Sequence, residues 1–82
     1  MHGDERSVPI NARTIIWRAL ENDASSVLIA HNHPSGNPQP SDDDLHATKL
    51  LVTITEPLNI KLVDHLIYGA GNWFSFRAAG LL

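Results

Sequence analysis

The stretch that decides the fold covers residues 30–45 and reads AHNHPSGNPQPSDDDL. It completes a continuous apolar run at 27–31 that ends in histidine, the pattern of a strand buried on both faces. Three prolines at 34–40 then exclude both a helix and a sheet ladder. Ser41 follows as a predicted helix N-cap, with three aspartates in the first turn, where the helix dipole favours acids. The stretch therefore predicts a strand, a rigid loop and a helix.

Apolar spacing on either side of this stretch predicts the other elements. They are an edge strand at 7–10, a helix at 12–22 capped by Asn11, a second helix that Pro57 ends, a strand at 60–68, a turn at 69–72 and a last strand at 73–76. The order β-α-β-loop-α-β-β predicts an α/β fold of the α+β sandwich type. With 82 residues, the chain 1–82 is expected to form a single domain.

Composition narrows the class of protein. A hydrophobic fraction of 43% and a charged fraction of 18% exclude a wholly disordered chain. The absence of cysteine excludes disulfides, thiolate metal sites and a cysteine nucleophile. No apolar run is long enough to cross a bilayer and no leader pattern opens the chain, so we expect a cytoplasmic protein with no membrane partner.

The charge balance disfavours a nucleic-acid partner. Nine acidic residues oppose six basic ones, the net charge is −3, and the basic residues are scattered singly. Nucleic-acid binding normally needs a basic face, because neutralised phosphates supply most of the non-specific affinity.

The candidate metal ligands lie within residues 30–45. His31 and His33 are two residues apart at a strand end, so their side chains are expected on the same side. The proline loop can bring Asp44, in the first turn of the next helix, back toward that strand end. Two imidazole nitrogens and one carboxylate oxygen suit zinc and leave a fourth tetrahedral position for water, as in catalytic zinc sites.

Each part of this pattern also has a plain structural explanation. Ser41-x-x-Asp44 is close to a capping box, in which each side chain satisfies the other residue's backbone N–H. His31 and His33 alone could form a polar strand end. The joint spacing, with the proline-rich loop between the two parts, favours a metal site, and Ser41 could both cap the helix and line that site.

The spacing His31-x-His33-Pro34, six residues, then Ser41-x-x-Asp44 resembles the signature of the JAMM (JAB1/MPN-type) zinc metalloproteases. The surrounding residues are closer still to the RadC-like branch of that family. The resemblance implies a JAB/MPN-like (cytidine-deaminase-like) domain without its N-terminal strands. It also implies that His31, His33 and Asp44 bind Zn²⁺ and that Ser41 stabilises the oxyanion. Related members hydrolyse isopeptide bonds.

The sequence departs from this family at the general base. The family has a glutamate on a strand before the first helix, whereas Glu5 and Glu21 do not align with that position. Two functions follow: a zinc-dependent hydrolase acting on an amide, peptide or isopeptide bond of a peptide or protein, or a non-catalytic zinc-binding or interaction module. If the sheet begins at 7–10, its open edge also predicts a homo-oligomer.

Asp64 and His65 are adjacent in a predicted strand, so their side chains should face opposite ways. Asp64 could hold a ligand histidine through its other ring nitrogen, or the two residues could form a surface or interface pair. The aromatic residues are expected in the core or an interface because they carry large apolar area. They are Trp17, Tyr68, Trp73, Phe74 and Phe76.

Overall fold

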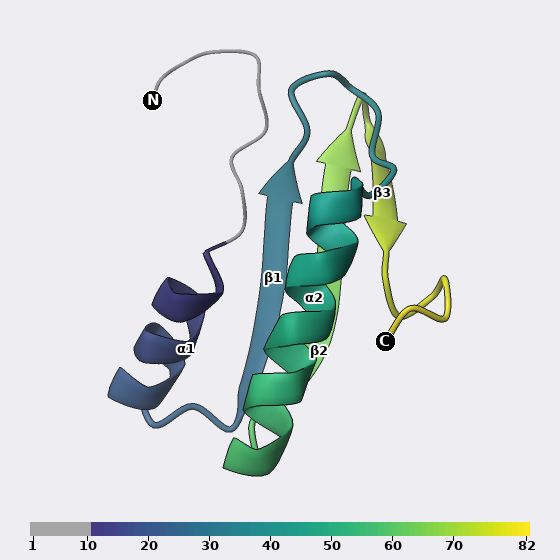
Figure 1. Ribbon diagram of the computed structural model, residues 1–82. Coiled ribbons are helices and arrows are strands. Elements are labelled where there is room, and N and C mark those ends of the chain that lie inside the picture. The colour runs from purple at the N-terminus through teal and green to yellow at the C-terminus, as the bar shows by residue number, and fades with distance from the viewer. Residues whose placement is uncertain (1–10) are drawn as a thin grey trace.

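The computed structural model describes residues 11–82 and shows an α+β arrangement of two helices and a three-stranded mixed sheet (Figure 1). In chain order the elements are α1 (Ala12–Glu21), β1 (Ser26–Asn32), α2 (Asp42–Thr55), the 3-10 turn η1 (Glu56–Leu58), β2 (Lys61–Gly69) and β3 (Asn72–Ser75). This order confirms the sequence-based prediction from the first helix onward. The strand expected at 7–10 lies outside the described residues. Neither helix is long and apolar enough to cross a membrane.

The sheet has the order β1-β2-β3. β1 and β2 run parallel, and α2 forms the crossover between them, whereas β2 and β3 are antiparallel. The turn between β2 and β3 consists of Ala70 and Gly71, with φ of 50° and 81°. Two consecutive residues with positive φ give the backbone twist that a tight hairpin needs.

Both helices begin at the predicted caps. The Asn11 side chain accepts a hydrogen bond from the Thr14 N–H at 3.1 Å, and Ser41 caps α2. In Figure 1, α2 lies across one face of the sheet and α1 lies beside β1. The core forms between these layers around Ile29, Leu51 and Leu62. Packing of the helices on one sheet face thus places the start of α2 near the end of β1.

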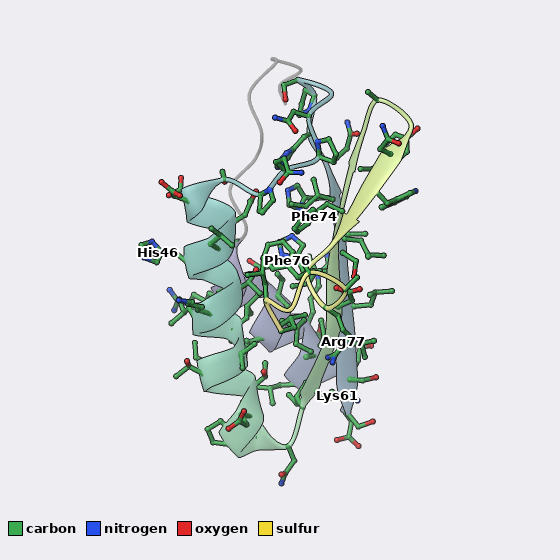
Figure 2. The ribbon with its side chains drawn as sticks, turned by 90° about the vertical axis from the view of Figure 1, so that its right-hand side faces the viewer. His46, Lys61, Phe74, Phe76 and Arg77 are labelled. Carbon is green, nitrogen blue, oxygen red and sulfur yellow. The ribbon has the colours of Figure 1, made fainter. Side chains whose placement is uncertain are left out.

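The prediction that β1 is buried on both faces is wrong for the described chain. Its residues alternate, so that Ile29 is buried while Leu28 is 60% exposed. The reason is that α2 covers one face, and no described element covers the other. Trp17 and Trp73 are likewise exposed rather than part of this core. Phe76 is buried, and Figure 2 shows it between α2 and the sheet while His46 points away from the sheet.

β2 contains one irregularity that decides which of its side chains face α2. Val27 pairs with Leu62 but Leu28 pairs with Asp64, so Val63 is an extra residue, as in a β-bulge. Leu62 and His65 are consequently both buried although they are three residues apart. The Arg77 side chain donates hydrogen bonds to the carbonyls of Leu62 and Val63, which stabilises the bulge.

Candidate metal centre

Three predicted ligands meet at one place in the structure. His31, His33 and Asp44 each offer one donor atom, and these atoms all lie within 4.8 Å of one another. The two imidazole rings lie on the same side of the chain, with centroids 4.8 Å apart. His33 follows the last residue of β1, and its backbone N–H donates to the Tyr68 carbonyl at 2.9 Å, which continues the sheet pairing. The structure therefore confirms the predicted convergence of the three residues.

The proline-rich loop is held against β2 at Gly69. A Cβ at this position would lie 2.8 Å from the backbone carbonyl of Gly36, so only glycine permits the close approach. The next loop residue, Asn37, presents its carbonyl to His33 Nδ1 at 2.9 Å. A carbonyl can only accept, so His33 Nδ1 is the donor in this contact, and the other nitrogen, Nε2, lies 3.1 Å from Asp44 Oδ2. The loop thus aims His33 Nε2 at the cluster.

Asp44 belongs to the capping box and to the cluster at once. Its backbone N–H donates to the Ser41 hydroxyl at 3.1 Å, and its Oδ2 accepts from the Ser41 N–H at 2.9 Å. Burial raises the pKa of Asp44, but the Ser41 hydrogen bonds and the nearby histidines outweigh burial and hold the pKa below its ordinary value. The carboxylate is therefore charged at neutral pH, with its other oxygen, Oδ1, 3.7 Å from His31 Nε2.

The remaining donor atom is a buried nitrogen without a partner. Among residues 11–82, His31 Nε2 is the buried side-chain polar atom that makes no hydrogen bond. Burial lowers the pKa of His31, partly against the attraction of Asp44, so the ring is neutral at pH 7. An unsatisfied buried acceptor beside a carboxylate is costly, and a bound cation would satisfy it. Two imidazoles and one carboxylate are a donor set that zinc accepts, so these residues fit the metal that the resemblance implies.

His65 contacts the cluster, and sequence reasoning did not place it there. His65 is fully buried, and its Nε2 lies 2.9 Å from His31 Nδ1. Burial, with the neighbouring His31, lowers the pKa of His65 to about 4. The expectation of a surface pair is therefore wrong for His65. The alternative role of Asp64 is also wrong, because its carboxylate accepts hydrogen bonds from the Ser75 hydroxyl and the Arg77 N–H instead of a ligand histidine.

Among residues 11–82, the cluster contains no carboxylate besides Asp44 that could act as a general base. In the described range, His31, His33 and Asp44 form the complete group of clustered metal-type donors. Glu21 lies at the exposed end of α1, and Glu5 falls outside the described residues. In this part of the chain, the cluster offers donor atoms that could hold a metal but no separate base.

Comparison with known proteins identifies the family of this chain. The family model for the RadC-like JAB domain matches residues 1–81, so the chain belongs to this family. A UPF0758 protein from Rhodobacter capsulatus is 48% identical over 75 residues, which cover 92% of this chain and 35% of that protein. A UPF0758 protein from Aquifex aeolicus is 41% identical over 80 residues, covering 98% of this chain and 35% of that protein. The chain thus spans about a third of the length of these relatives.

Proposed function

We propose that this RadC-like JAB domain binds one zinc ion through His31, His33 and Asp44 and takes part in hydrolysis of an amide, peptide or isopeptide bond. The observation that carries the proposal is the partnerless, buried His31 Nε2 within a His-His-Asp cluster. The donor set, the tightness of the cluster and the family membership all support it. The substrate class is a peptide or protein.

The residues have separable roles in this proposal. A zinc ion with an open position supplies Lewis-acid chemistry and lowers the pKa of a bound water to about 7. His31, His33 and Asp44 would hold the ion. The Ser41 oxygen accepts the Asp44 N–H, so the hydroxyl proton of Ser41 remains available for donation. We assign that proton to the carbonyl oxygen on which negative charge develops.

The cluster itself favours a second candidate, a zinc-binding module without catalysis. Residues 11–82 place no second carboxylate beside Asp44 in the cluster. Losing a general base typically removes about 10²–10⁴-fold in rate. On this proposal the 82-residue chain binds zinc and shows little or no hydrolysis by itself.

Zinc content tests the shared part of both candidates. Elemental analysis of the purified chain should give one zinc per chain, and His33→Ala and Asp44→Ala should lose it. Asp43→Ala and His46→Ala are matched controls, because both residues are exposed on α2 and lie outside the cluster. Wild-type zinc content in both ligand variants would contradict the proposal.

Hydrolysis separates the two candidates. Fluorogenic peptide and isopeptide substrates are incubated with the zinc-loaded chain and with Ser41→Ala. Turnover that Ser41→Ala reduces supports a hydrolase complete within the chain, and turnover that Glu5→Gln abolishes would assign the base to Glu5. Full zinc occupancy without turnover supports the non-catalytic module for this length of chain.

A further inference from the structure

Two buried polar side chains form a hydrogen-bonded path behind His31. His65 from β2 is 0% exposed and Thr48 from α2 is 2% exposed. His65 Nε2 lies 2.9 Å from His31 Nδ1, and His65 Nδ1 lies 2.8 Å from the Thr48 hydroxyl. The same hydroxyl lies 2.8 Å from the backbone carbonyl of Asp44. The path therefore joins the back of one proposed ligand to the backbone of another.

Hydrogen-bond chemistry gives this path a single direction. The Asp44 carbonyl can only accept, so the one hydroxyl proton of Thr48 is donated to it. The Thr48 oxygen then accepts from His65, which places the His65 proton on Nδ1 and leaves a lone pair on its Nε2. That lone pair accepts the proton on His31 Nδ1. With its proton on Nδ1, His31 keeps a lone pair on Nε2, the atom that belongs to the donor cluster.

We propose that Thr48 and His65 are positioning residues of the metal centre, which fix His31 in the Nδ1–H tautomer and so present its Nε2 lone pair to the ion. The inference rests on the proposed zinc site. A neutral imidazole can carry its proton on either nitrogen, and only one of the two forms leaves Nε2 free to bind a metal. Hydrogen bonds behind ligating histidines commonly select that form.

The Nδ1 protons of His31 and His33 are held by different acceptors. His33 donates to a backbone carbonyl, that of Asn37, which can only accept. His31 donates to another imidazole, which accepts at Nε2 only when its own proton is on Nδ1. Thr48 is therefore needed to fix the tautomer of His65, and His65 in that tautomer fixes the tautomer of His31. Phe76 stacks on the His65 ring, with centroids 4.3 Å apart and planes 11° apart, and holds the ring in the required orientation.

A pair of threonine variants tests the path. Thr48→Val removes the hydroxyl with little change of shape, and Thr55→Val is the matched control. Thr55 is also buried on α2, and its hydroxyl also donates to the carbonyl four residues back at 2.8 Å. We expect zinc affinity, measured by competition with a chromophoric chelator, to fall about 10–100-fold in Thr48→Val and to stay within about twofold in Thr55→Val. Equal zinc affinities in the two variants would overturn the proposal.

The tautomer of His31 gives a second readout that needs no metal. ¹⁵N NMR of the metal-free wild type should show His31 with a protonated Nδ1 and an unprotonated Nε2. In Thr48→Val the proton should move wholly or partly to Nε2, whereas a merely structural role of Thr48 would leave it on Nδ1. An unchanged His31 tautomer in Thr48→Val would refute the path. Because this measurement uses metal-free protein, it tests the path even if the wild type fails to bind zinc.

Replacement of His65 gives a rescue test. His65→Leu has no acceptor for His31 Nδ1–H, so zinc affinity should fall at least tenfold. His65→Gln can present its amide oxygen to the same N–H and should restore most of that affinity. If the Leu variant binds zinc as tightly as the Gln variant, the acceptor at residue 65 has no positioning role.

Discussion

Removal of zinc should lower the melting temperature of this chain by an amount that can be worked out. The proposed ligands come from the end of β1 and the first turn of α2, so the ion would connect two elements that the proline-rich loop separates. A ligand that binds only the folded state stabilises it by about 2.7 kcal/mol at a free concentration of about 100 times Kd. For 82 residues, an unfolding entropy of about 2.1 cal/mol/K per residue gives about 0.17 kcal/mol/K in total. The expected shift is therefore about 16 °C.

Thermal unfolding followed by circular dichroism measures this shift with zinc and with excess chelator. Asp44→Asn is the informative variant, because an amide oxygen can still accept the Ser41 N–H and retain the cap, while the negative charge is lost. Its melting temperature should respond little to zinc. Asp43→Asn, an exposed residue in the same turn, should respond as the wild type does. An equal zinc response in Asp44→Asn and the wild type would refute the ligand assignment.

Three further predictions concern the parts around the site. Gly69→Ala should destabilise the fold by about 1–3 kcal/mol in chemical denaturation, because the new Cβ meets the Gly36 backbone; it should also weaken zinc binding by displacing the loop. Gly71→Ala, with open space but a φ of 81°, should affect stability alone, so equal losses of zinc affinity would contradict this account. Burial raises the pKa of Asp64, but three hydrogen bonds outweigh burial and lower this pKa. The charged carboxylate therefore stabilises the fold above the unfolded pKa of about 3.9. This stabilisation is lost as pH falls through the lower folded pKa. Urea titrations should accordingly show Asp64→Asn less stable than the wild type at pH 7, with the gap closing at acid pH; a gap independent of pH would exclude this role. Association through the sheet edge expected at residues 7–10 remains a prediction. Light scattering at micromolar concentration should show more than one subunit mass, which a stable monomer would contradict.

The helix starts and the loop could be predicted because their signals are local. Asn11 and Ser41 are cap residues directly before helix-forming segments, and the cap geometry needs only the next three residues. The three prolines exclude regular structure whatever the rest of the chain does. The predicted ligands are also close in sequence, so the strand end and the helix start could be predicted to lie near each other. These features needed no knowledge of distant pairing.

The place of His65 could not be predicted because it depends on a bulge in a parallel strand pair. Strict alternation from the buried Leu62 would turn Asp64 toward α2 and His65 away from it. The extra residue Val63 reverses this phase, so His65 faces inward and pairs with Ile29, two residues before His31. A parallel register between strands joined by a long crossover is not set by neighbouring residues. The sequence therefore predicts that Asp64 and His65 face opposite ways, but it does not predict which of the two faces α2.

The two explanations for Asp44 are compatible in the structure. A capping box and a metal ligand looked like alternatives because each uses the same carboxylate. Oδ2 accepts the Ser41 N–H of the cap at 2.9 Å and also lies 3.1 Å from His33 Nε2, while Oδ1 lies 3.7 Å from His31 Nε2. A carboxylate already fixed by its cap loses less side-chain freedom on binding a cation than a free one does, so the cap should strengthen zinc binding. Asp44, in the first turn of α2, thus completes the helix cap and is held in place for the proposed zinc site.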